Sequence, residues 1–333
     1  MHPTYIVEQG AKLGVESRLL VVEKDGQVLQ KIPLIKIEAV VIFGNVSVTT
    51  PALKRLMAEG KDIVFLTLDG QYCGRVVGPQ SGFGQLRHRQ YQRFDDKTFA
   101  LEVARLFVRG KLLNMRTLLL RYARKEQEAA FRAVAENLGG MAKAASEAPT
   151  VQALMGLEGA GTAQYFSVFK HLFHGDWHFE KRVRRPPADP VNVLLSLGYT
   201  LLTREIEAVV NLVGMDPYLG FLHGVAYGRP SLALDLMEEF RPIVVDSVVL
   251  RACNTGQVTP AHFHKGDSAE RPVVLDDEGR RAFLQAWETR LSERFRHPDS
   301  QESVTYRRVF ELQARGLARH IQGEGTYRPF LVR

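Results

Sequence analysis

The hydrophobic pattern changes its period once along the chain. In residues 4–77, short apolar clusters rich in β-branched side chains are separated by turn residues, which is typical of strands. The clusters are Tyr5–Val7, Leu19–Val22, Val28–Ile32, Ala39–Phe43 and Ile63–Leu68. Between the second and third, Asp25 and Gly26 tolerate the positive φ angles of a type I′ hairpin. One helix interrupts the strands, with Thr50 as its cap, Pro51 in its first turn and Gly60 as its stop.

Beyond a glycine-rich break at 78–84, the apolar period becomes about 3.6 residues, which indicates helices. The expected helices cover 96–124, 126–146, 150–172, 191–213, 231–242, 243–250, 277–295 and 303–321, with 254–276 expected to be irregular. The first of them is either one long helix or a kinked pair broken near Gly110. Two of these helices have start signals in the sequence, which are Thr150 and the pair Asp189-Pro190. The predicted fold class is therefore α+β: a small, mainly β domain with one helix at 1–77, a linker at 78–90, and a larger all-α domain at 91–333.

The segment from Tyr218 to Pro242 contains a histidine, His223, and then a predicted helix that Ser231 can cap. Asp235 and Glu238 would lie on one face of this helix, at positions i and i+3. Their repulsion would be relieved by a divalent cation with oxygen ligands between them. Alternatively, both acids simply interact favourably with the helix dipole, and the segment by itself favours this second explanation.

Glu158 lies in a predicted helix among Gly156, Gly159 and Gly161. Each glycine costs a helix about 1 kcal/mol relative to alanine, so their clustering indicates that another helix or a ligand approaches closely. Neither Glu158 nor His223 indicates a metal site when taken singly, because acids on helix faces and histidines in helical cores are common.

The charge balance suggests a polyanionic partner. The chain has 44 Lys and Arg residues against 37 Asp and Glu residues, a net charge of +7, and nucleic acid is the first candidate. The densest basic cluster, Lys181, Arg182, Arg184 and Arg185, lies in residues 175–190 beside Trp177, His178 and Phe179. Such a segment suits phosphate contact and base stacking, or it is a solvated loop whose aromatic side chains belong to the helical core; composition leaves both open.

Several classes of protein are excluded or disfavoured. The two cysteines, Cys73 and Cys253, form no CxxC pair, which argues against a disulfide framework and a thiolate zinc site. No run approaches the roughly 20 apolar residues of a membrane span, and no secretory signal is evident, so a cytoplasmic protein without a membrane partner is expected. P-loop, GxGxxG, HExxH and GxSxG motifs are also missing from the sequence. The remaining candidate chemistry is a hard-cation site of carboxylates and imidazole, with Mg²⁺ or Mn²⁺ acting on a phosphodiester.

Four segments together resemble one known family. They are MGLEG at 155–159, RRPPADPVNVLLS at 184–196, GFLH at 220–223 and SLALDLMEEFRP at 231–242. This combination resembles the CRISPR-associated integrases, the DNA endonucleases of spacer acquisition. The resemblance covers essentially the whole chain, because that family also places a β-rich domain before a larger helical domain.

The resemblance implies a set of site residues. Glu158, His223 and Glu238 would be the metal ligands, with Asp235 as the fourth catalytic residue, so Glu158 would have to pack against the segment that carries the others. Some members have an aspartate where Glu238 stands; Glu239 lies about 100° further around the predicted helix and is not favoured. The DNA-binding candidates are the cations of the basic cluster and two residues of the following helix: Lys181, Arg182, Arg184, Arg185, Asn192 and Tyr199.

The resemblance also implies the reaction and its partners. Members of the family insert a short foreign DNA duplex into a CRISPR repeat array through attack by its 3′-hydroxyls, and they cleave branched DNA. The implied cofactor is Mg²⁺ or Mn²⁺, and the implied partners are double-stranded and branched DNA, a second copy of the chain, and a small second adaptation subunit. The alternatives are a general branched-DNA repair nuclease and a non-catalytic DNA-binding scaffold.

Overall fold

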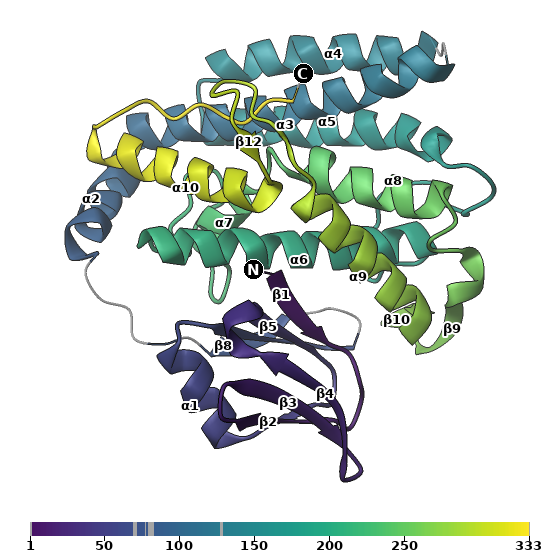
Figure 1. Ribbon diagram of the computed structural model, residues 1–333. Helices are drawn as coiled ribbons and strands as arrows, with labels where there is room; N and C mark the ends of the chain where they lie inside the picture. The colour runs from purple at the N-terminus through teal and green to yellow at the C-terminus, as the bar shows by residue number, and fades with distance from the viewer. Residues whose placement is uncertain (1, 69–71, 77, 79–82, 127–128, 333) are drawn as a thin grey trace. The chain divides into compact units, whose positions relative to one another are not determined.

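The computed structural model describes residues 2–68, 72–76, 78, 83–126 and 129–332. The chain divides into two compact units, Met1–Ser81 and Gly82–Arg333. The first is rich in strands and the second is mostly helical, so the predicted α+β class is confirmed (Figure 1). No helix within the described residues is long and apolar enough to cross a membrane.

In its described residues, the first unit is built from two sheets, one α-helix and a short 3₁₀ helix. Its elements are β1 (His2–Ile6), β2 (Lys12–Glu16), β3 (Leu19–Lys24), β4 (Gln27–Pro33), η1 (Leu34–Lys36), β5 (Ile37–Phe43), β6 (Ser47–Val48), α1 (Thr50–Ala58), β7 (Asp62–Leu66) and β8 (Tyr72–Val76). The strand orders within the described residues are β1-β5-β7-β8 and β4-β3-β2-β6. Leu13, Leu20, Ile37, Leu56 and Ile63 are among the side chains that form their common core.

Local signals predicted the β3–β4 hairpin correctly. Asp25 and Gly26 have φ angles of 51° and 76°, as a type I′ turn requires. The cap of α1 is Thr49 and not Thr50, because Thr49 is extended and accepts a hydrogen bond from Ala52 N at 3.4 Å. Strands β2 and β8 were not predicted; each has a glycine near its centre, which weakens the apolar alternation.

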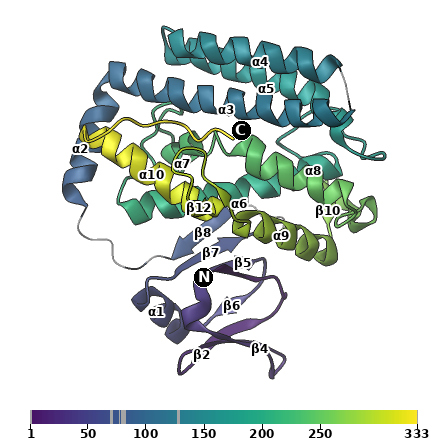
Figure 2. The same ribbon diagram turned by 45° about the horizontal axis from the view of Figure 1, so that its top comes forward.

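The second unit contains α2 (Gly84–Asp95), α3 (Lys97–Glu126), α4 (Ala129–Glu147), α5 (Val151–Phe169), η2 (Lys170–Leu172), α6 (Pro190–Val213), α7 (Ser231–Leu236), a π-helical segment η3 (Arg241–Asp246), α8 (Ser247–Asn254), η4 (Pro260–His262), α9 (Asp277–Ser292) and α10 (Tyr306–Gln322). Helices α3, α4 and α5 lie side by side in both ribbon views (Figure 2). Helix α6 contacts α7, α8, α10 and η3. Large side chains buried in this unit include Phe107, Tyr165, Phe240, Trp287 and Phe310.

The second part of the predicted linker is helical. Residues 84–90 form the first turns of α2, whereas 79–82 lie outside the described residues. Helix α2 has no apolar stripe that a sequence pattern could reveal, since Leu86 and Gln90 are its buried residues. Hydrogen bonds at 2.8 Å join the Gln90 amide to the backbone of Asp216 and hold the helix in place instead.

Helix starts in this unit follow the predicted caps. Thr150 accepts from Ala153 N at 3.1 Å at the start of α5, and Asp189 accepts from Asn192 N at 2.8 Å at the start of α6. Helix α3 continues through Gly110, where a Cβ atom would lie 2.7 Å from Pro329 Cβ. That glycine therefore permits close packing and does not break the helix.

Ser231 does not cap α7. Pro230 occupies the cap position, and the Ser231 hydroxyl donates instead to the carbonyl of Gly224 at 2.8 Å. Helix α7 ends at Leu236, so Glu238 lies beyond it.

The second unit is not entirely α-helical, in contrast to the expectation for 91–333. Its described residues also form the hairpin β9 (Phe263–Ser268) and β10 (Arg271–Leu275), and the short ribbon β11 (Phe295–Arg296) and β12 (Ser303–Val304). The β9–β10 hairpin replaces the irregular segment expected at 254–276. Most residues of its two strands are half-buried and do not alternate between buried and exposed, so the strands lack the apolar alternation that marks a strand in the sequence.

Candidate active site

Glu158 is positioned by the contact of α5 with α3 and α4. A Cβ atom at Gly161 would overlap Leu112 of α3 and lie 3.3 Å from Leu138 of α4, so this glycine allows the close helix approach that the sequence indicated. Gly156 and Gly159 have open space around them. The Oε1 atom of Glu158 contacts Nζ of Lys111 on α3 and accepts from the Thr162 hydroxyl at 2.9 Å.

Glu238 is buried in the turn that follows α7, with 3% of its side chain exposed. Its Oε2 lies 2.7 Å from Lys111 Nζ and its Oε1 lies 3.1 Å from Arg241 Nε, so it forms two ion pairs. Burial alone would raise the pKa of Glu238, but the charges of Arg241 and Lys111 outweigh it and lower the pKa to about 2. Glu238 is therefore an anion at neutral pH.

His223 and Asp235 form a second pair. His223 Nδ1 lies 2.7 Å from Asp235 Oδ1. Because a carboxylate only accepts, Nδ1 carries the proton, and Nε2 is the ring nitrogen left for another partner. Burial lowers the pKa of His223, but the hydrogen bond and charge of Asp235 more than offset it, so the pKa is raised.

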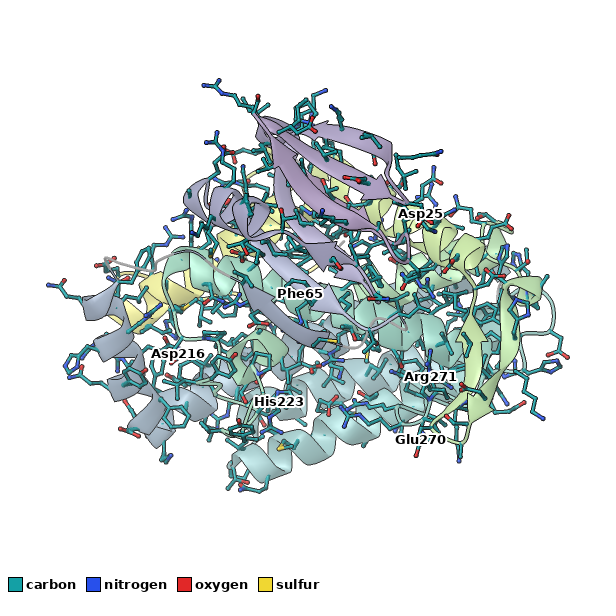
Figure 3. All side chains as sticks on the ribbon, turned by 90° about the horizontal axis from the view of Figure 1, so that it is seen from below. Asp25, Phe65, Asp216, His223, Glu270 and Arg271 are labelled. Atoms are coloured by element: carbon teal, nitrogen blue, oxygen red, sulfur yellow. The ribbon has the colours of Figure 1, made fainter. Side chains whose placement is uncertain are left out.

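Asp235 also organises the loop that carries His223. It is fully buried and accepts from the backbone N–H groups of Phe221, Leu222 and His223 at 2.5–2.9 Å. A Cβ atom at Gly220 would lie 2.8 Å from Asp235 Oδ2, so glycine lets the loop wrap around this carboxylate. Burial raises the pKa of Asp235, although His223 opposes the shift. Figure 3 labels His223 and Asp216 on the loop between α6 and α7, apart from Glu270 and Arg271 at the β9–β10 turn.

Asp235 and Glu238 do not act as a pair on one helix face. Because α7 ends at Leu236, Asp235 faces the His223 loop, whereas Glu238 faces Lys111 and Arg241. The favourable-dipole explanation also fails, since neither acid lies in the first turn of α7.

The structure brings the predicted metal ligands into one region without assembling a complete metal centre. Glu158 and Glu238 contact the same Lys111 Nζ, and His223 and Glu238 influence each other's pKa through their charges. Within the described ranges, no group of three or more His, Cys, Asp or Glu side chains is arranged to hold a metal ion. The donor set nevertheless suits Mg²⁺ or Mn²⁺, because two carboxylates converge on one positive charge and an imidazole lies on the adjoining loop.

The basic cluster contains residues of two kinds. Lys181, Arg184 and Arg185 are exposed. Asn192, by contrast, is fully buried, and its Oδ1 accepts from Arg182 Nη1 at 2.8 Å and from Val183 N at 2.9 Å. Its Nδ2 donates to the carbonyl of Lys181 at 2.9 Å. In this arrangement Asn192 holds the basic segment in place and does not itself face a ligand.

Tyr199 lies between the basic cluster and the carboxylates. The guanidinium groups of Arg182 and Arg241 lie over its ring, 5.4 and 4.9 Å from the centroid. Its hydroxyl donates to Asp246 Oδ1 at 2.6 Å, and Tyr165 donates to Oδ2 of the same residue at 2.9 Å. Burial raises the pKa of Asp246 to about 6 against the opposing effect of these hydrogen bonds.

The aromatic residues beside the basic cluster belong mainly to the core. Trp177 and Phe179 are each 5% exposed and pack near Phe169 and Phe173, as the second explanation of this segment expected. They are not available for base stacking.

No sequence pattern singled out Lys111, Arg241, Tyr165 or Asp246 as site residues. Lys111 was detectable in principle: Phe107 and Met115, four residues to either side on α3, are buried, so the helical period places a lysine on the buried face. A buried ammonium needs anionic partners. Which anions it pairs with depends on helix packing and is not encoded locally.

Comparisons with known proteins agree on one family. The model of the family described as CRISPR associated protein Cas1 matches residues 4–289. The CRISPR-associated endonuclease Cas1 3 of Thermus thermophilus is 40% identical over 332 residues, which are 99% of this chain and 97% of that protein. CRISPR-associated endonuclease Cas1 1 of Chlorobaculum tepidum is 35% identical, with 100% and 99% coverage.

Solved structures agree with these matches. A CAS1 protein from Thermotoga maritima is 28% identical, with a TM-score of 0.83 and coverage of 98% of this chain and 99% of that one. A chain of a Cas6-RT-Cas1–Cas2 complex is also 28% identical, with a TM-score of 0.82; the match covers all of this chain and 36% of that one.

Proposed function

This chain belongs to the CRISPR associated protein Cas1 family, and from that premise we propose that it is a metal-dependent DNA endonuclease and integrase that inserts short DNA duplexes into a CRISPR repeat array. The observation that carries the proposal is the convergence of Glu158 and Glu238 on one buried positive charge, with His223 on the adjoining loop. The relatives named as endonucleases support phosphodiester chemistry.

The proposed metal ligands are Glu158, Glu238 and Nε2 of His223. When bound there, Mg²⁺ or Mn²⁺ would polarise the reacting phosphate and lower the pKa of an attacking water or 3′-hydroxyl.

The remaining side chains prepare these ligands. Asp235 fixes the ring of His223 through Nδ1, and Thr162 orients the carboxylate of Glu158. Lys111 and Arg241 keep Glu238 ionised and supply positive charge near the site where a phosphate becomes more negative during the reaction.

The proposed joining step is an in-line transesterification. The 3′-oxygen of the incoming duplex forms a bond to a target phosphorus, the bond from that phosphorus to its original 3′-oxygen breaks, and the proton lost by the attacking hydroxyl is balanced by protonation of the leaving oxygen. Inserting both ends of one duplex needs two active sites at a fixed separation, which favours a homodimer. The solved complex that contains Cas1 and Cas2 supports the small second subunit as a partner.

The experiment that tests the proposal compares Glu158→Ala and His223→Ala with the wild type. DNA affinity is measured in EDTA with forked DNA, and strand joining is measured with Mn²⁺, a duplex with free 3′-hydroxyls and a plasmid that carries a repeat array. We expect both variants to bind DNA within about twofold of the wild type, because affinity comes mainly from phosphate contacts, and to lose joining. The matched control is Glu180→Ala, an exposed glutamate paired with Lys170, which should join normally. Full joining by either site variant would refute the assignment.

A non-catalytic DNA-binding scaffold is the second candidate, since Lys111 already lies between the two carboxylates. Calorimetry with Mn²⁺ separates the two functions: the scaffold predicts no metal binding. The ratio of hydrolysed to joined DNA distinguishes a branched-DNA repair nuclease from an integrase. A repair nuclease should hydrolyse forked DNA under conditions in which it does not join strands.

A further inference from the structure

A small pocket in the helical unit has a strongly basic lining. Its lining residues are Lys111, Met115, Thr162, Phe166, Arg182, Arg184, Tyr199 and Arg241. Four of these carry a positive charge and, as far as the described residues go, none carries a negative one. The cavity volume of about 20 Å³ holds only one or two water-sized groups. It is too small for a base or a sugar, whereas one or two non-bridging oxygens of a phosphate fit.

The cations of this pocket are only partly neutralised by the protein. Arg182 donates to neutral acceptors, which are Asn192 Oδ1, the carbonyl of Val183 and the Ser196 hydroxyl. The buried Nε atom of Arg182 has no hydrogen-bond partner within the described part of the chain. Buried donors of this kind are normally paired, so an acceptor that is not part of the chain is indicated.

The pocket adjoins the candidate active site through shared residues, one of which is Thr162, whose hydroxyl donates to Glu158. Lys111 and Arg241 line the pocket, and each also forms an ion pair with Glu238. An anion in the pocket would therefore contact the same Lys111 and Arg241 side chains that the carboxylates contact. Tyr199 forms another wall, held by Asp246 beneath the guanidinium groups of Arg182 and Arg241.

We propose that this pocket binds a phosphate group of the DNA strand on which the carboxylate site acts, and so sets the register of that strand. The inference rests on the proposed function, because it takes DNA as the ligand. Guanidinium and ammonium groups around a volume of this size recognise non-bridging phosphate oxygens through charge-assisted hydrogen bonds. They read no base, so the register is independent of sequence.

The test is a scan of forked DNA in which one phosphate at a time is replaced by a neutral methylphosphonate. Affinity is measured in EDTA, so that no cleavage occurs, for the wild type, Arg184→Gln and Arg185→Gln. Arg184 lines the pocket and Arg185 does not, yet both are exposed neighbours in one segment, which makes them a matched pair. Equal melting temperatures for the three proteins ensure that folding is not the cause.

For the wild type and Arg185→Gln, we expect neutralising one linkage, or two adjacent linkages, to weaken binding about tenfold more than neutralising any other, as for a lost charged hydrogen bond. In Arg184→Gln this extra penalty should shrink to about twofold. A uniform penalty along the strand, or the same profile in both arginine variants, would overturn the proposal. Since the scan needs no metal, it reports on the pocket even if Glu158→Ala retains activity and the proposed reaction fails.

Discussion

Glu158 of α5 and Glu238 of the turn after α7 share one counterion, because the Nζ atom of Lys111 contacts both carboxylates. The Lys111 and Glu238 side chains are each only 3% exposed. Two carboxylates held this close repel each other unless a positive charge lies between them. Lys111 fills that role in this structure, and a divalent cation is the proposed alternative.

The first prediction concerns Lys111→Met, because methionine has about the length of the lysine methylene chain and carries no charge. Without metal, the variant should lose about 3 kcal/mol of unfolding free energy, as for other buried ion pairs that lose one partner. Mn²⁺ should then stabilise the variant more than it stabilises the wild type, because the metal replaces the missing charge. Urea unfolding with Mn²⁺ and with EDTA measures both effects.

The control for that experiment is Lys170→Met, which removes a lysine from an exposed pair with Glu180. It should change stability by less than about 0.5 kcal/mol. If Mn²⁺ stabilises Lys111→Met and the wild type equally, the shared-counterion account is wrong.

The second prediction concerns Asp235→Asn. An amide cannot accept from His223 Nδ1 and the backbone N–H groups of the loop as a carboxylate does, so the imidazole should lose its orientation. Metal-dependent DNA cleavage should fall about 10–100-fold, with DNA affinity in EDTA unchanged. Asp176→Asn is the control, because it changes the same kind of pair at an exposed position, where Asp176 Oδ1 lies 3.0 Å from His178 Nδ1. Wild-type cleavage rates in Asp235→Asn would contradict the positioning role.

The third prediction separates the two kinds of residue in the basic cluster. Asn192→Ala should lower the unfolding free energy by about 1–3 kcal/mol, because the Lys181 carbonyl, Arg182 Nη1 and Val183 N–H lose their hydrogen bonds to this buried amide. Lys181→Ala should leave stability unchanged and weaken DNA binding, with a shallower salt dependence. Thermal unfolding and DNA titration at several salt concentrations test both, and an unaltered melting temperature in Asn192→Ala would count against its structural role.

The fourth prediction concerns pH. The pKa of Asp246 is raised from 3.8 to about 6 by burial. Its folded-state pKa exceeds the unfolded value, so its contribution to stability is complete below about pH 4 and is lost as pH rises through 6. The wild type should therefore lose up to about 3 kcal/mol relative to Asp246→Asn between pH 4 and 7. Urea unfolding of both proteins across that range gives the difference, and a constant difference would contradict the shifted pKa.

The sequence by itself determined the features that depend on neighbouring residues. Asp25 and Gly26 specify their turn, and Thr150 and Asp189 specify helix starts, because the groups that form these structures lie within four residues of each other. The change of apolar period determined the strand-rich and helical parts in the same way. Where local signals were weak, as in the polar helix α2, the interpretation was incorrect.

Only the tertiary structure decided how the candidate site is arranged. Their spacing predicted that Asp235 and Glu238 form a pair, yet α7 ends before Glu238, and Asp235 contacts His223 whereas Glu238 contacts Lys111. Lys111 meets Glu158 and Glu238 because α3, α5 and the turn after α7 pack together, and such contacts join segments that are distant in the sequence. Burial likewise made Asn192 a support for the basic segment. Spacing along a chain specifies which side chains share a helix face only while the helix lasts; beyond its end, packing determines which groups meet.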